Sequence, residues 1–406
     1  MKRRKFLKAA SLLTGGMLIP VGLNSWVAKS VAGAESRKRL VVVFLRGGID
    51  GLNVVIPHQE TDYYQARPTL AVPYPQEADG AIDLDSFFGL HPSLKDLIPF
   101  WKQKNLAFIH ACGSPDETRS HFDAQDYMES GTPGVKSTKD GWMNRLLEQL
   151  PQEQLTQALN VGNTTPRILK GVMPVSHLRP GKNSANPLPI DNPKVNHAFN
   201  SLYSGSDRLS LAYQEGMKAR EMILAELRQE MMSASRGAPS VANFVDDASE
   251  VAKLMVGDTK TQLAFMDIGQ WDTHINQNRM LDRLLPPLGQ GLATLVKGLG
   301  SIYSDTVIVV MSEFGRTVKE NGNQGTDHGH GNVMWLLGDA VKGGKVYGEW
   351  KGLTESVLYE GRDLPVTTDF RKAIASILTQ HMSISASNLA QIFPGYQPVG
   401  NLNLFG

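Results

Sequence analysis

Cysteine is almost absent from this sequence. Cys112 is the single cysteine among 406 residues. One thiol cannot form a disulfide within the chain, and it cannot supply a Cys-x-x-Cys metal motif. We expect Cys112 to be a small buried hydrophobic residue. Any bound metal ion must therefore be held by histidine, aspartate and glutamate side chains.

A net charge of one sign is also missing. The 41 lysine and arginine residues nearly balance the 40 aspartate and glutamate residues, which gives a formal net charge of +1. With no basic stripe and no aromatic platform, nucleic acid is not an expected partner. Low-complexity tracts and internal repeats are absent too, and a hydrophobic fraction of 41% is enough for a large core. We expect one α/β domain over residues 35–406.

The N-terminus departs from this even distribution of charge. Lys2-Arg3-Arg4-Lys5-Phe6-Leu7-Lys8 precedes an apolar run from Ala9 to Val27 and then Ala32-Gly33-Ala34. The arginine pair followed by Phe-Leu-Lys resembles a twin-arginine signal with cleavage after Ala34. The apolar run is short and broken by glycine and proline, which disfavours the alternative of a membrane anchor. The sequence predicts a bacterial periplasmic protein that is exported by the twin-arginine machinery and keeps no membrane span after cleavage of residues 1–34.

Short apolar runs rich in β-branched residues alternate with helical patterns. We expect strands at 40–45, 106–109, 263–266, 306–311 and 333–337, and helices at 92–104, 121–129, 208–232, 288–299 and 370–380. The helix at 288–299 is expected to begin after Pro286-Pro287. This alternation is typical of a doubly wound, mostly parallel sheet with helices on both faces. Residues 151–200 are rich in proline, asparagine and glycine and predict an irregular excursion at the rim of the sheet.

A polar cluster follows each of the first four predicted strands. The four clusters are Arg46-Gly47-Gly48-Ile49-Asp50-Gly51, residues 116–121, Gln270-Trp271-Asp272-Thr273-His274 and Ser312-Glu313-Phe314-Gly315-Arg316. Ligands of open parallel sheets bind beyond the carboxyl ends of the strands. We therefore expect the four clusters to converge at one edge of the sheet.

A fifth cluster, Gly325-Thr326-Asp327-His328-Gly329-His330-Gly331-Asn332, precedes the last predicted strand. Glycine allows close backbone approach, while aspartate and neutral histidine are common ligands of zinc and related divalent metal ions. A polar turn with solvated histidines is the alternative. Convergence with the other four clusters favours a metal site.

Five phrases in these clusters resemble a known family. They are Phe-Leu-Arg-Gly-Gly-Ile-Asp-Gly-Leu at 44–52, Arg-Ser-His-Phe-Asp-Ala-Gln at 119–125, Trp-Asp-Thr-His at 271–274, Ser-Glu-Phe-Gly-Arg-Thr at 312–317 and Gly-Thr-Asp-His-Gly-His-Gly-Asn at 325–332. Over nearly its whole length the chain resembles the exported family called domain of unknown function 1501, of the alkaline phosphatase and sulfatase superfamily. The resemblance implies an alkaline phosphatase-like fold, one or two divalent metal ions, most simply zinc, and an anionic ester substrate.

The resemblance also assigns residues. It implies that Ser120, at the start of the helix predicted at 121–129, is the catalytic nucleophile, although an ordinary helix-capping serine is the alternative. Arg46, Arg316 and His121 are expected to bind the substrate, although the arginines can instead pair with nearby carboxylates. The implied metal ligands are Asp50, Asp272, His274, Glu313, Asp327, His328 and His330.

Two departures from the superfamily pattern leave two functions open. Asp272 and His274 are closer together than the superfamily usually has them, and Phe314 stands where a histidine ligand is expected. The residues that remain predict a periplasmic metal-dependent hydrolase of phosphate or sulfate esters. Phe314 favours the alternative, a non-catalytic protein on the same fold that binds an envelope partner or a glycan.

Overall fold

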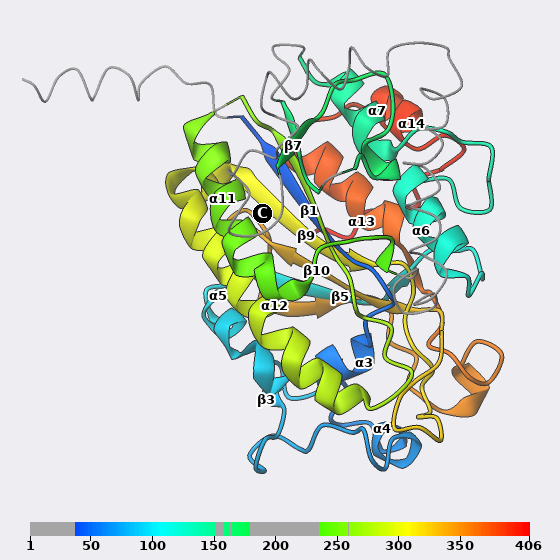
Figure 1. Ribbon diagram of the computed structural model, residues 1–406. Coiled ribbons are helices and arrows are strands. Elements are labelled where there is room, and N and C mark those ends of the chain that lie inside the picture. Colours follow the sequence, from blue (N-terminus) through cyan, green and yellow to red (C-terminus); the bar gives the residue numbers. More distant parts are fainter. Residues whose placement is uncertain (1–36, 152–156, 163, 179–234, 259) are drawn as a thin grey trace, which may run out of the picture. The chain divides into compact units, whose positions relative to one another are not determined.

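The computed structural model describes residues 37–151, 157–162, 164–178, 235–258 and 260–406 (Figure 1). The predicted signal at 1–34, the predicted helix at 208–232 and residues 179–200 of the predicted excursion lie outside the described residues. Within the described part, no helix is both long enough and apolar enough to cross a bilayer.

A nine-stranded sheet is the centre of the described structure. The strand order is β11-β5-β10-β9-β1-β8-β6-β7, with β12 beside β5. Every pairing is parallel except those of β10, which runs antiparallel to β5 and β9. This confirms the predicted mostly parallel α/β sheet. The strands are β1 (Arg39–Leu45), β5 (Leu106–Gly113), β6 (Ala158–Val161), β7 (Ser176–Leu178), β8 (Leu263–Ile268), β9 (Thr306–Ser312), β10 (Asn332–Leu337), β11 (Lys345–Tyr347) and β12 (Thr368–Asp369).

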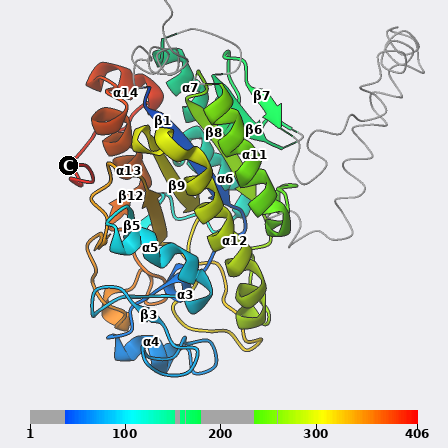
Figure 2. The same cartoon turned by 90° about the vertical axis from the view of Figure 1, so that its left-hand side faces the viewer.

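Strand β1 is apolar from Leu40 to Leu45 because both of its faces are buried. Val41, Val43 and Leu45 belong to one hydrophobic core, whereas Leu40 and Val42 belong to the other. Figures 1 and 2 show a helical layer on each face of the sheet. One layer contains η1 (Pro92–Leu97), α5 (Ile98–Lys102), α11 (Phe244–Gly257) and α12 (Gln277–Leu299), and the other contains α6 (His121–Ser130), α7 (Trp142–Gln149), α13 (Phe370–Ser376), η7 (Ile377–His381) and α14 (Ala386–Ile392).

Three elements differ from the predictions. Helix α12 begins at Gln277 and contains Pro286 and Pro287, which were expected to precede it. The leucines on both sides of the prolines are buried in the core, so tertiary packing offsets the lost backbone hydrogen bonds. The helix predicted at 92–104 is a 3₁₀ helix followed by α5. Part of the predicted excursion is regular, because β6 and β7 join the edge of the sheet and η2 (Arg167–Leu169) lies between them.

A smaller three-stranded sheet packs beside the main one. It contains β2 (Val55–Ile56), β4 (Gly89–Leu90) and β3 (Ile82–Asp83). In the chain, α3 (Gly51–Val54) precedes β2, and α4 (Thr61–Ala66) lies between β2 and β3. A third hydrophobic cluster, which includes Leu52, Ile56 and Tyr63, holds these elements together. The remaining short helices are η4 (Val241–Asn243), η5 (Gly300–Asp305) and η6 (Glu355–Val357).

The pairing register brings the predicted clusters to one edge of the main sheet. Leu45, at the end of β1, is in register with Ile268 of β8 and with Ser312 of β9. Asn332, at the start of β10, is in register with Cys112 near the end of β5. The loops after four parallel strands and the loop before β10 therefore meet at the carboxyl edge.

Candidate metal centre

Three side chains from distant parts of the chain meet at this edge. His121 is the first residue of α6, Asp272 lies in the loop after β8, and His328 lies in the loop before β10. One potential ligand atom from each of the three lies within 4.8 Å of the others. Among the described residues, this is the single group of histidine, cysteine and acidic side chains arranged closely enough to hold a metal ion.

His274 adds a fourth donor to this group. Its Nε2 atom lies 3.0 Å from Oδ1 of Asp272 and 2.9 Å from Nε2 of His328. The structure therefore brings three imidazoles and one carboxylate together, and we call His121, Asp272, His274 and His328 the four-residue cluster. Three nitrogen donors and one oxygen donor are a common ligand set for zinc.

The Nδ1 atom of each imidazole faces an oxygen acceptor. His121 Nδ1 lies 2.7 Å from Oε1 of Glu313, His328 Nδ1 lies 2.9 Å from the Arg119 carbonyl, and His274 Nδ1 lies 3.1 Å from Oδ1 of Asp327. These acceptors place the ring proton on Nδ1 and leave the Nε2 lone pair for the cluster. Metal-binding histidines are commonly oriented in this way.

Two buried atoms in the cluster lack hydrogen-bond partners. Nε2 of His121 and Oδ2 of Asp272 are 3.6 Å apart, and neither has a hydrogen bond. Leaving buried polar atoms unsatisfied is costly, and a cation bound between them would satisfy both. The facing Nε2 atoms of His274 and His328 likewise need a shared proton or a metal ion between them. The residues present therefore fit a divalent metal ion.

The electrostatics of the cluster favour an ionised Asp272. Burial opposes its ionisation, but the three neighbouring imidazoles and the charge of Arg316 hold its pKa well below the usual range. Burial also disfavours a charged His121, yet the carboxylates of Asp272 and Glu313 raise its pKa to about 9. Burial lowers the pKa of His328. The cluster attracts positive charge, which is the condition that a cation site requires.

Phe314 forms a wall of the cluster. Its ring centroid lies 4.8 Å from that of His121 and 5.0 Å from that of His328. Gly48 allows this packing because it has a φ of +67°, and a Cβ atom there would lie 2.7 Å from Phe314. Phe314 cannot bind a metal ion, and its ring packs against two imidazoles of the cluster.

Asp50 is placed differently from the prediction. Its carboxylate is fully buried and accepts hydrogen bonds from Nη1 of Arg67 at 2.5 Å and Nη2 of Arg67 at 3.1 Å. Gln277 Nε2 also donates to Asp50 at 2.5 Å. Asp50 is therefore held in an internal ion pair and does not reach the four-residue cluster. Arg67 supplies the positive charge that a metal ion was expected to supply.

The two arginines predicted to bind substrate are structural instead. Arg46 is 2% exposed, and its guanidinium pairs with Glu129 and Asp267 at 2.7 Å each. Arg316 is 1% exposed and donates to the Gly48 carbonyl, to other backbone carbonyls and to Asp272. The guanidinium groups are buried in these contacts, which corrects the expectation of substrate binding. His121, also expected to bind substrate, belongs to the four-residue cluster.

Besides Asp50, three predicted ligands lie outside the cluster. Glu313 accepts from His121, from Gln125 and from the Gly47 amide, and Asp327 accepts from His274. Both carboxylates orient imidazoles of the cluster and are not themselves in it. His330 faces away, because its Nε2 donates to the Ser114 carbonyl at 3.0 Å and its ring packs against Tyr359.

Ser120 caps the N-terminus of α6, directly before His121. Its Oγ accepts from the Asp123 amide at 3.5 Å, and the side chain is exposed. This is the capping role that the sequence left open beside the catalytic one. Ser120 directly precedes His121, whose side chain belongs to the cluster.

Two contributors to the site carry little sequence signal. Arg67 follows α4 in a segment without a motif, and its pairing with Asp50 depends on how the loops fold. The Arg119 carbonyl that orients His328 is a backbone group, which no side-chain pattern predicts. A conformational search of the loops, with backbone acceptors included, would be needed to find them.

Residues 37–393 match the family model described as "Protein of unknown function (DUF1501)". The chain belongs to this family. The match covers the whole sheet and every residue of the four-residue cluster. No curated protein matches the sequence.

Similar solved structures have low sequence identity to this chain. Ps i-CgsB in complex with k-i-k-neocarrahexaose has a TM-score of 0.44 and 10% identity, covering 91% of this chain and 75% of that one. A Vibrio parahaemolyticus protein in the alkaline phosphatase superfamily has a TM-score of 0.39 and 13% identity, covering 77% and 63%. The C-terminal periplasmic domain of EcEptC from Escherichia coli has a TM-score of 0.40 and 10% identity, covering 91% and 89%. At these values the similarity carries no information about activity.

Proposed function

We propose that this DUF1501 protein is a metal-dependent hydrolase of phosphate or sulfate esters that acts in the bacterial periplasm. The observation that carries the proposal is the convergence of three imidazole Nε2 atoms on the Asp272 carboxylate, with each Nδ1 proton fixed by an acceptor. A merely structural cluster has no need of three imidazoles oriented in the same sense.

His121, Asp272, His274 and His328 would hold the ion, and zinc suits their donor set. When bound there, a divalent ion supplies a Lewis acid that polarises an ester oxygen and stabilises negative charge. Glu313 and Asp327 keep the Nδ1 protons of His121 and His274 in place. Arg316 neutralises part of the Asp272 charge from the buried side, and an anionic substrate would approach from the side of the partly exposed His274 and His328.

Ser120 is the proposed nucleophile. It stands one residue before His121, which belongs to the cluster, and it is exposed. The free amide groups and dipole of the α6 N-terminus favour negative charge at this position, both on the oxygen of Ser120 and on a substrate ester group.

A second candidate function rests on Phe314 and Arg67. Phe314 fills the place of one expected ligand, and Arg67 neutralises Asp50, so the predicted ligand set is reduced to one cluster. A protein that binds an envelope partner or a glycan without catalysis would tolerate this loss. Such a protein would keep the ion for stability and have no need of Ser120.

Hydrolysis of p-nitrophenyl phosphate and p-nitrophenyl sulfate by purified, exported protein tests the proposal. We expect turnover that a chelator removes and added zinc restores. Ser120→Ala should abolish turnover and retain the bound metal, whereas Asp272→Asn should lose both. Glu148→Gln, on the exposed side of α7, is the matched control and should behave as wild type. Zinc-loaded protein that hydrolyses neither ester faster than buffer would contradict the enzyme and favour the binding protein.

A further inference from the structure

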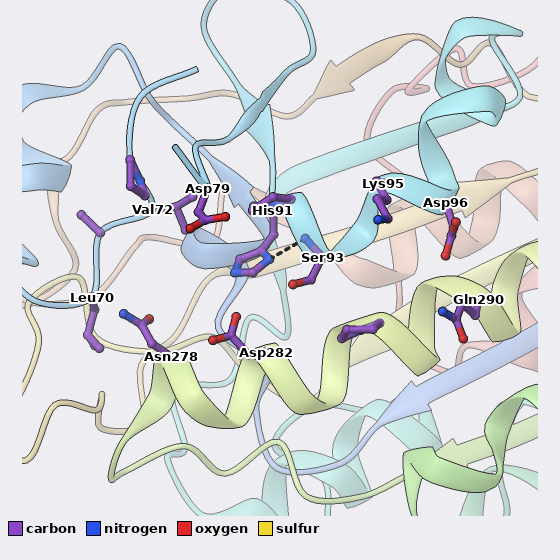
Figure 3. Close-up of a pocket in the computed structure, with 14 residues that line it drawn as sticks. Leu70, Val72, Asp79, His91, Ser93, Lys95, Asp96, Asn278, Asp282 and Gln290 are labelled. Carbon is purple, nitrogen blue, oxygen red and sulfur yellow. Dashed lines mark hydrogen bonds between the residues drawn. The ribbon is translucent and has the colours of Figure 1, made fainter. Parts of the chain in front are cut away.

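A second polar pocket lies beside α12, outside the four-residue cluster. It has a volume of about 710 Å³ and is bounded by α12, η1 and the chain segment around residues 70–79. Figure 3 shows His91, Asp79, Asp282 and Asn278 gathered at one end of the pocket, and Lys95, Asp96 and Gln290 at the other. None of these residues has a role in the proposed hydrolysis.

His91 presents a hydrogen-bond donor to this pocket. Its side chain is only 6% exposed, and its Nδ1 atom accepts from the Ser93 amide at 3.2 Å. With Nδ1 acting as the acceptor, the proton of the neutral ring must be on Nε2. Burial lowers the pKa of His91 to about 4, so the ring is neutral at physiological pH. Nε2 has no protein partner among the described residues, and the ring points into the pocket (Figure 3).

Three carboxylates supply acceptors around this donor. Asp79, Asp96 and Asp282 line the pocket, and none of their carboxylates forms an ion pair or a side-chain hydrogen bond with another described residue. These three carboxylates are too far apart to hold one metal ion. Among the described residues, the single group close enough to do so belongs to the four-residue cluster. An occupant of this pocket must therefore be large enough to reach several separate acceptors.

The mixture of donors and acceptors identifies the chemistry of the occupant. A cationic ligand would need acceptors alone, but the pocket also offers the Nε2 proton of His91, the ammonium group of Lys95 and the amide of Gln290. Vicinal hydroxyl groups both donate and accept, so they match carboxylates and amide or imidazole donors together. Leu70, Val72, Pro92 and Pro286 add apolar surface for the C–H faces of a sugar ring. We propose that this pocket binds a neutral saccharide.

Binding to an array of neutral oligosaccharides tests this proposal with the full exported protein, in the presence of a chelator so that the metal centre does not contribute. The best array ligand is then titrated by calorimetry. We expect specific binding that changes little between low and high salt. Asp282→Asn should weaken it by about tenfold or more, because the carboxylate accepts from hydroxyl groups. His91→Asn should do the same, because asparagine keeps an acceptor for Ser93 and removes the Nε2 donor.

Glu148→Gln removes one exposed carboxylate on the opposite face of the sheet and should leave the affinity unchanged. Thermal melting of each variant shows whether it is folded. The two pocket variants change different side chains, so the test does not depend on one substitution. No binding to any neutral glycan would overturn the proposal, as would binding that both variants retain. Spermidine that binds at this pocket, with an affinity that falls steeply as salt rises, would assign the carboxylates to a polyamine instead.

Discussion

The Nδ1 atom of His121 lies 2.7 Å from Oε1 of Glu313. This contact joins the start of α6 to the end of β9, two segments far apart in sequence, and it decides which nitrogen of His121 faces Asp272. Glu313 was expected to be a ligand itself. In the structure Glu313 instead contacts His121 from outside the four-residue cluster, and the first prediction depends on that difference.

Glu313→Gln should weaken metal binding without abolishing it. Glutamine keeps an acceptor for the Gly47 amide but loses the charge that holds the His121 proton on Nδ1. Loss of such an orienting carboxylate typically lowers metal affinity by about 10–100-fold. Competition with a chromophoric zinc chelator measures the change, and Glu148→Gln is the control. Complete loss of metal, as large as that in Asp272→Asn, would show that Glu313 is a direct ligand.

Asp50→Asn separates a structural ion pair from a metal ligand. The substitution leaves the buried Arg67 guanidinium uncompensated, and breaking a buried pair in this way costs about 3–5 kcal/mol. Urea unfolding should therefore show a large loss of stability, while the folded protein keeps its metal. A variant of normal stability that has lost the metal would instead return Asp50 to the ligand set.

His110 should make the protein sensitive to acid. Its ring is 1% exposed, Nε2 donates to the Val55 carbonyl, and Nδ1 accepts from the Ala111 amide. Burial lowers its pKa to about 4 from an unfolded value near 6.5. The unfolded chain therefore binds more protons between those values, and stability falls as the pH falls through this window. The loss from pH 7 to pH 5 is about 2 kcal/mol for this residue.

Urea unfolding at several pH values measures this effect. His110→Gln should be less stable at pH 7 but should lose less stability on acidification than wild type. The exposed His177→Gln variant is the control and should retain the wild-type pH dependence. An unchanged pH dependence in His110→Gln would refute the assignment.

Export depends on the arginine pair at the N-terminus. Arg3→Lys with Arg4→Lys keeps the charge but removes the residues that the twin-arginine receptor recognises, so the precursor should remain in the cytoplasm. Cell fractionation and N-terminal sequencing follow the outcome, and wild-type protein should begin near Glu35. Normal export and processing of the double variant would remove the basis for a periplasmic location.

The strands of the sheet could be predicted because the physical signal is local. Residues 40–45 and 307–311 are continuously apolar and rich in β-branched side chains, as is typical of strands buried on both faces. The convergence of the loops followed from the parallel direction of these strands. Strands β6 and β7 were not predicted, because both are short and they form one end of the main sheet.

The roles of the individual site residues were harder to predict, because they depend on partners brought in by the fold. Asp272, His274 and His328 were expected in the site and lie in it. The sequence does not reveal that Arg67 pairs with Asp50. It also does not reveal that Glu313 contacts His121 and remains outside the four-residue cluster. Nearby glycine residues identified the correct loops. Distinguishing a candidate ligand from the residue that orients it requires the hydrogen-bond partners of each side chain in the folded structure.

Elemental analysis of natively exported protein tests the central claim most directly. The account predicts about one divalent ion per chain, with zinc as the metal, and loss of that ion in Asp272→Asn and in His121→Ala. Removing the ion with a chelator should lower the melting temperature, and zinc should restore it, since a site built from distant loops exists only in the folded chain. Wild-type protein without stoichiometric metal, and with a melting temperature that chelator and zinc leave unchanged, would contradict the account.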